Sequence, residues 1–185
     1  MASNLKKSDI GTLLSHFQTV SGFQRSNRFR VDITPPSPLQ EVSLFAVNIQ
    51  VPSQTITYYS DTMAPSGNYI DIPARREYDD RFMIEFIVDK LWIGRKFFDD
   101  WVDLMFVKSQ GSSYKNSVMV NYWNKIKGKI DIHALDLTDK TNRRITLFDA
   151  WPSTILPNQL SNDTPGEYLT LVIDMNYRYY TTSAT

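Results

Sequence analysis

Residues Arg76–Phe106, REYDDRFMIEFIVDKLWIGRKFFDDWVDLMF, contain two hydrophobic periods in succession. From Arg81 to Asp89 the period is two, which is typical of a strand with one buried face. Phe82, Ile84, Phe86 and Val88 share one side, while Arg81, Met83, Glu85, Ile87 and Asp89 share the other. From Leu91 to Val107 the apolar positions follow a helical stripe instead, made of Leu91, Phe98, Trp101 and Met105 with Phe97 and Leu104 beside it. The segment therefore predicts a β-strand followed by the one long helix of the chain.

The carboxylates in this segment have two interpretations. Asp79 and Asp80, with Glu77 or Glu85, could form a paired-carboxylate site of the kind used by glycoside hydrolases. However, Asp is also favoured at a turn leading into a strand, and the nearby arginines at positions 75, 76 and 81 can neutralise such a pair. Scaffold and intersubunit ion pairs are the favoured interpretation. A carboxylate-dependent hydrolase is kept as a distant alternative.

Composition limits the other possibilities. The chain has 185 residues, enough for a single domain with its own core, and 13% of them are aromatic. Twenty basic residues balance twenty acidic ones, so no overall field attracts nucleic acid or acidic membranes. The absence of Cys excludes thiol chemistry and disulfides. No stretch has the pattern of a signal peptide or a membrane span, so we expect a soluble chain without stable membrane association.

Further alternating runs predict a mainly β protein. Strands are expected at 28–33 and 43–51, the second with Phe45, Val47, Ile49 and Val51 on one face. A long hairpin-like excursion follows from Pro52 to Asp80, and weaker strands are expected at 117–122, 129–134 and 144–149. The clearest strand is a single long one from Leu169 to Tyr179. A short amphipathic helix is predicted at Asp9–Gln18.

These patterns predict an antiparallel β-sandwich or partly closed barrel with one flanking helix. The inward-facing positions define a core, which we predict to contain Phe29, Val31, Phe82, Ile84, Phe86, Phe98, Trp101, Trp151, Leu171 and Ile173. We divide the chain into an N-terminal arm (1–25), one β domain (26–180) and a C-terminal tail (181–185).

Catalytic and metal-binding signals are weak throughout. His16 and His133 lie in different predicted elements, and no GxSxG, HExxH or calcium-loop pattern occurs. Lys125, Lys127 and Lys129 lie near two aromatic residues, but a solvated loop explains them better than a phosphate site. We predict no catalytic residue, no metal and no cofactor. The sequence indicates a protein that binds copies of itself or a partner.

The order of several segments carries a resemblance: SNRFRVDI, VPSQTI, IDIPARREYDDRFMIEFIVD, FFDDWVDLMF, LFDAWPSTI, LSND and YLTLVIDMNYRYY. From about Ser26 to Tyr180 the chain resembles the tail tube proteins of contractile-tailed bacteriophages. The resemblance implies a non-enzymatic virion subunit, made in the host cytoplasm, that forms hexameric rings stacked into a hollow tube. It further implies strands donated to a continuous inner barrel. The implied partners are other copies of the chain, the sheath, the baseplate, the tail terminator and DNA passing non-specifically through the bore.

In such a tube, DNA slides best past a wall without Lys or Arg. We therefore predict that the lumen is lined by the polar strand faces, namely Asn48, Gln50, Glu85, Thr170, Asp174 and Asn176. Arg81 and Arg178 share those faces and are expected at ring boundaries in ion pairs. The full set of predicted intersubunit and inter-ring residues is Asp61, Arg75, Arg76, Asp79, Asp80, Arg81 and Arg178. A baseplate-proximal tube initiator and a type VI secretion or tailocin tube protein are the nearer alternatives.

Overall fold

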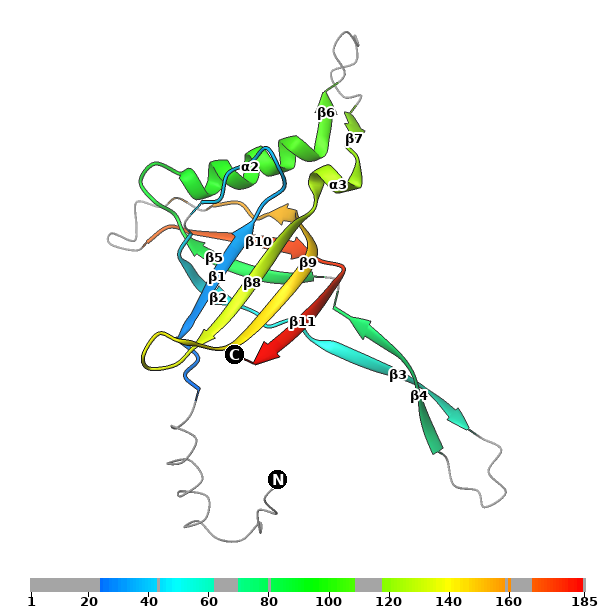
Figure 1. The fold of residues 1–185 in the computed structure, drawn as a ribbon. Helices are drawn as coiled ribbons and strands as arrows, with labels where there is room; N and C mark the ends of the chain where they lie inside the picture. Colours follow the sequence, from blue (N-terminus) through cyan, green and yellow to red (C-terminus); the bar gives the residue numbers. More distant parts are fainter. Residues whose placement is uncertain are drawn as a thin grey trace.

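A computed structural model describes residues 24–42, 44–61, 70–79, 81–108, 118–158, 160 and 168–184 (Figure 1). The strands are β1 Phe29–Thr34, β2 Ala46–Ile49, β3 Gln54–Asp61, β4 Ile70–Tyr78, β5 Arg81–Ile87, β6 Phe106–Lys108, β7 Val118–Val120, β8 Gly128–Leu135, β9 Thr141–Ile155, β10 Thr170–Asn176 and β11 Tyr179–Ala184. The helices are α2 Ile93–Met105 and α3 Trp123–Ile126. The helix predicted at Asp9–Gln18 lies outside the described residues.

The body is built from two antiparallel sheets that share the long strand β9. Residues 141–150 of β9 pair with β8, and β1 and β11 complete this layer, which we call the β8 sheet. Residues 151–155 of β9 pair with β10, followed by β5 and β2, which we call the β5 sheet. The strand changes sheets next to Asp149, whose backbone adopts a φ of 56°. The predicted β-sandwich or partly closed barrel is confirmed.

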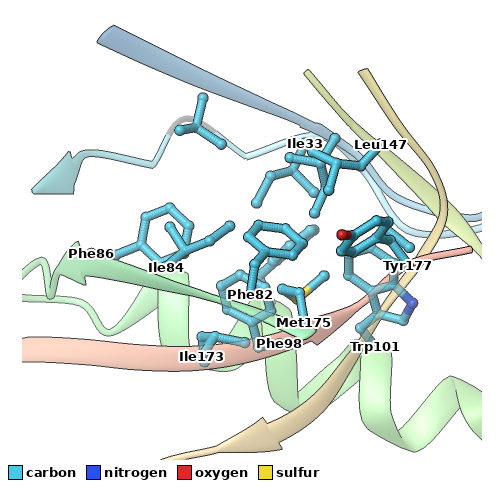
Figure 2. Packing of buried hydrophobic residues seen from close by; sticks show 14 of the residues in the cluster. Ile33, Phe82, Ile84, Phe86, Phe98, Trp101, Leu147, Ile173, Met175 and Tyr177 are labelled. Atoms are coloured by element: carbon cyan, nitrogen blue, oxygen red, sulfur yellow. The ribbon is translucent and has the colours of Figure 1, made fainter. Parts of the chain in front are cut away.

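Helix α2 closes one end of the space between the sheets. Figure 2 shows Phe98 and Trp101 pointing from the helix into the buried cluster, towards Phe82 and Met175. The Trp101 side chain is fully buried, and its indole N–H donates to the Ile126 carbonyl at 2.9 Å. Gly128 leaves room for this ring, because a Cβ there would lie 2.7 Å from the indole and from the Thr34 carbonyl.

The core otherwise follows the alternation in the sequence. Eight of the ten predicted core residues are buried: Val31, Phe82, Ile84, Phe86, Phe98, Trp101, Leu171 and Ile173. Phe29 and Trp151 are partly buried and pack against the edge of the cluster. The flanking helix is shorter at both ends than the predicted 91–107. The Asp89 carboxylate accepts hydrogen bonds from the Leu91 and Gly94 amides just before and within its first turn.

Two strand predictions were wrong. In β2 the register shifts between Ala46 and Asn48, so Leu44, Ala46 and Ile49 pack towards the core, whereas Phe45 and Val47 are exposed. A bulge adds one residue to a strand and so reverses the alternation that follows it. The predicted single closing strand is divided at Tyr177–Arg178 into β10 and β11, which belong to different sheets. The predicted domain boundary after Tyr180 therefore falls inside β11.

Two ribbons project from the body (Figure 1). β3 and β4 form a two-stranded antiparallel ribbon with nothing paired to its outer edges among the described residues, and we call it the arm. It corresponds to the predicted hairpin excursion. β6 and β7 form a shorter ribbon next to α2 and α3, away from the arm.

Trp101 provides a test of the role of α2. We expect Trp101→Ala to lower the free energy of unfolding by about 3–5 kcal/mol, because it removes the largest fully buried side chain and its hydrogen bond. The matched control is Trp123→Ala, since Trp123 is 45% exposed and should cost about 0.5–1 kcal/mol. Urea unfolding followed by circular dichroism measures both. Equal losses in the two variants would contradict the packing described for α2.

Candidate assembly surfaces

The six residues predicted to line a lumen lie on one face of the β5 sheet. In the register of the strands, Glu85 is opposite both Asn48 and Val172, while Asp174 is opposite Met83. The Gln50 amide donates to the Met83 carbonyl at 3.2 Å and continues the same row. Thr170 and Asn176 occupy the two ends of β10 on this side. We call this surface the polar face, and it consists of Asn48, Gln50, Glu85, Thr170, Asp174 and Asn176.

The polar face carries two carboxylates and little positive charge. Glu85 and Asp174 contribute the acidic groups, and Arg81 lies at one end, opposite Asn176. On the same side of β5, Met83 lies between Arg81 and Glu85, and Ile87 lies beyond Glu85. Both apolar side chains are exposed. A shallow depression of about 330 Å³ is lined by Asn48, Gln50, Met83 and Glu85 together with Ile49. Apart from Glu85, Asp174 and Arg81, the residues named on this surface are neutral.

The outer face of the β8 sheet has a different character, because its charges are paired. Asp131 is only 6% exposed and accepts two hydrogen bonds from Arg144, at 3.0 and 2.6 Å. Thr146 donates to the same carboxylate at 2.6 Å, and the Lys129 ammonium lies 3.0 Å away. Burial by itself would raise the pKa of Asp131, but the hydrogen bonds from Arg144, Thr146 and Lys129 outweigh it and lower that pKa to about 2.

Sequence reasoning missed the Asp131 cluster. Its members come from β8 and β9, which pair so that Asp131 is opposite Thr146 and His133 is opposite Arg144. The alternation of Lys129, Asp131 and His133 in the sequence indicated an outward face, but not that the aspartate would be covered. Only the cross-strand register brings Arg144 and Thr146 to it.

His133 forms a short chain of polar contacts that does not amount to a catalytic relay. Its Nε2 lies 3.2 Å from the Asp32 carboxylate, and its Nδ1 lies 3.3 Å from the Thr141 hydroxyl. Burial lowers the pKa of His133, an effect that Asp32 opposes and the nearby guanidiniums of Arg30 and Arg144 reinforce. Asp32 is also bound by Arg30 at 3.1 Å, so the chain belongs to an ion-pair ladder on a sheet face. His16 lies outside the described residues.

Among the described residues, Asp79 and Glu85 of the hydrolase hypothesis lie apart. Asp79 accepts a hydrogen bond of 2.5 Å from the Ser53 hydroxyl at the base of the arm. Glu85 lies farther along β5, roughly 13 Å from Arg81 at 3.3 Å per residue. Asp80 lies outside the described residues. No group of three or more His, Asp or Glu side chains in the described part of the chain could hold a metal ion.

The predicted intersubunit residues have mixed surroundings. Arg75 pairs with Glu77 on the same strand of the arm, and Arg76 lines a groove at the arm's base. Arg178 lies at the corner between β10 and β11 rather than on the polar face, with its guanidinium 3.6 Å from Asp149. Asp149 also binds Lys127 at 3.0 Å. The side chain of Asp61 lies outside the described residues, although its backbone ends β3.

The arm exposes apolar side chains on both of its faces. Along β3, Ile56 and Tyr58 point to one side, while Tyr59 points to the other and is opposite Ile72 on β4. Tyr59 is 75% exposed and Ile72 is 51% exposed. An isolated two-stranded ribbon is marginally stable in water at best. The arm therefore has the properties of an element that a partner covers.

The body, too, has surfaces suited to association. Among the described residues, β1, β11 and β2 each pair on one side only, so both sheets end in unpaired backbone groups. Such edges are usually protected or joined to another chain. No helix in the described residues is long and apolar enough to cross a membrane. In the part of the chain that the structure describes, open sheet edges and an apolar arm are features typical of a protein that binds other chains.

The chain belongs to the phage tail tube protein family, whose match spans residues 24–183. Proteins of this family are structural, and the chain is a structural subunit of a tail tube. No curated protein sequence matches it.

Solved structures share its fold at low sequence identity. A chain of the anti-feeding prophage baseplate has a TM-score of 0.64 and 13% identity, covering 86% of this chain and 95% of that one. A chain of the sheath/tube terminator of an extracellular contractile injection system has a TM-score of 0.59 and 11% identity, covering 86% and 96%. A chain of the anti-feeding prophage tube-terminating cap has a TM-score of 0.57 and 15% identity, covering all of both chains.

The lowered pKa of Asp131 gives a test of the ion pairs on the outer face of the β8 sheet. Because the folded pKa is about 2 and the ordinary value is 3.8, the carboxylate stabilises the folded state fully above about pH 4. This contribution is lost as the pH falls from about 4 towards 2. We expect Asp131→Asn to lower the free energy of unfolding by about 2 kcal/mol at pH 7 and by much less near pH 2.5.

The control for this experiment is Asp100→Asn, on the exposed side of α2. It should change stability by less than about 0.5 kcal/mol at either pH. Denaturant unfolding at the two pH values measures both variants. A loss for Asp131→Asn that is the same at pH 2.5 and pH 7 would contradict the lowered pKa.

Proposed function

We propose that the chain assembles into hexameric rings that stack into a hollow tube, with the polar face lining the bore. DNA passes through this bore during delivery, and a contractile sheath surrounds the tube. The baseplate and the tail terminator contact its two ends. Assembly takes place in the host cytoplasm, and the tube becomes part of the virion tail.

The observation that carries the proposal is the contrast in charge between the two outer sheet faces. The polar face has Glu85 and Asp174 and only Arg81 at its end. The β8 face has three cations, Arg30, Lys129 and Arg144, which are held in ion pairs. Cations in a bore bind phosphates and retain DNA, whereas neutral polar and acidic groups let it slide. The polar face is therefore the better wall for a DNA conduit.

The unpaired strand edges supply a way to close the ring. Each of the two sheets contains four antiparallel strands when β9 is counted in both, so its two edge strands run in opposite directions. The same sheet of a neighbouring copy can therefore pair with either edge and continue the antiparallel order. Repeating one contact by rotation gives a closed ring, and the same strand edges are then covered in every subunit. The arm and the N-terminal segment, the latter outside the described residues, are proposed to contact neighbouring subunits or rings. Arg75, Arg76, Asp79 and Arg81 are proposed to lie in or near those contacts.

Cysteine labelling tests which face lines the bore, and the chain contains no native Cys to interfere. We expect Asn48→Cys and Asp174→Cys in assembled tubes to react with a small maleimide but not with a maleimide attached to a large carrier protein. Arg30→Cys, on the opposite face, is the matched control and should react with both. Negative-stain microscopy confirms that the labelled sample consists of tubes.

In the unassembled chain all three cysteines should react with both reagents. If Asn48→Cys and Asp174→Cys accept the large reagent in intact tubes while Arg30→Cys rejects it, the assignment of faces is reversed. If the protein stays monomeric at every concentration, with or without a baseplate template, the proposed ring assembly is wrong.

A further inference from the structure

A groove of about 720 Å³ lies at the end of the sandwich that α2 leaves open. Its walls come from the base of the arm, the far ends of β8 and β9, and β11. Most of the lining is apolar or aromatic, including Val51, Tyr78, Ile145, Tyr179 and Tyr180. The groove therefore offers a surface that an apolar strand or ribbon could cover.

Two arginines in the groove have no carboxylate partner among the described residues. Arg76 of the arm's base and Arg143 of β9 both line it, and neither forms an ion pair with any carboxylate in the described part of the chain. Arg76 and Arg143 are both exposed. A guanidinium can bind a carboxylate through two parallel N–H···O hydrogen bonds. The chemistry of the groove thus fits a segment that is both apolar and acidic.

The outer half of the arm has this chemistry. It carries Tyr58 and Tyr59 on β3 and Ile72 on β4, all more than half exposed. Asp71 lies beside them and is held by a hydrogen bond of 2.7 Å from the Ser60 hydroxyl to its Oδ1. Because the apolar side chains point to both sides of the ribbon, a groove covers them better than a flat surface does.

The arm cannot fill the groove of its own chain. Gln54, Arg76 and Tyr78, which form the base of the arm, are themselves walls of the groove. The ribbon extends away from the body beyond them (Figure 1), so its outer half lies outside the groove. A second copy of the chain is the source of the segment that enters.

We propose that the groove binds the outer half of the β3–β4 arm of a second copy, with Asp71 of one copy beside Arg76 and Arg143 of the other. This inference rests on the proposed self-assembly and identifies a contact that would join one copy to the next. The contact joins two different surfaces, so each copy offers one arm and one groove. Such a contact repeats around a ring or along a stack.

Engineered cysteines test the contact directly. One chain carries Tyr59→Cys in the arm and the other carries Thr182→Cys in the groove, and the two are mixed before assembly. We expect a disulfide-linked dimer of the two different chains after mild oxidation of the tubes. The control replaces Thr182→Cys with Lys96→Cys, on the exposed side of α2, and should give no such dimer. Tubes that form normally without the Tyr59–Thr182 dimer overturn this inference and leave the proposed tube intact.

A charge exchange gives a second, independent readout. We expect Arg143→Glu or Asp71→Lys alone to raise the protein concentration needed for tube formation by about tenfold or more. The double variant should restore assembly, since the two charges exchange places. Lys96→Glu is the control and should leave the concentration unchanged. If the double variant assembles no better than the single variants, the pairing of Asp71 with the groove is wrong. A wild-type chain that never assembles defeats the proposed function as well.

Discussion

The packing of Trp101 between the two sheets is the interaction on which the rest of the fold depends. The ring is fully buried, is anchored to the Ile126 carbonyl and fits against Gly128, where β8 begins. It therefore ties α2, α3 and the start of the β8 sheet to the common core. Since α2 closes only one end of the sandwich, the other end stays open between the arm and β11. The closed end contributes to the stability of the subunit, and the open end is where we propose that another copy binds.

The outer face of the β8 sheet and the polar face differ in how their charged groups are arranged. On the β8 face, Asp131 forms ion pairs with Arg144 and Lys129, which join neighbouring positions of β8 and β9. On the polar face, Glu85 and Asp174 are the acidic groups. Asn48 and Gln50 are exposed, and the other four residues are half-buried. In the tube that we propose, the wall must be rigid, while the surface along which DNA passes must not retain it. The two faces lie on opposite sides of one shared core, so each can have its own arrangement of charges.

Much of the fold was predictable because strand and helix periods are local properties. The alternation of β5 and β10 identified both the buried residues and the polar face, and the change of period after Asp89 located α2. The faces of β2 were not predictable, since the bulge between Ala46 and Asn48 depends on its pairing with β5. The break between β10 and β11 was hidden for a similar reason. Leu169 to Tyr179 alternates without interruption, and the change of sheet at Arg178 comes from the strands it pairs with.

The sequence by itself determined the class of fold, most of the core and, through the order of its segments, the family. These follow from hydrophobic period and from motifs, which are readable along one chain. Only the tertiary structure decided that Arg144 and Thr146 cover Asp131, that Asp79 binds Ser53 rather than an arginine, and that Arg76 and Arg143 face the same groove. The residues in each of these sets are far apart in the sequence, and Arg76 and Arg143 are separated by 67 positions. Strand register and sheet packing bring them together, and neither can be read from a local sequence pattern.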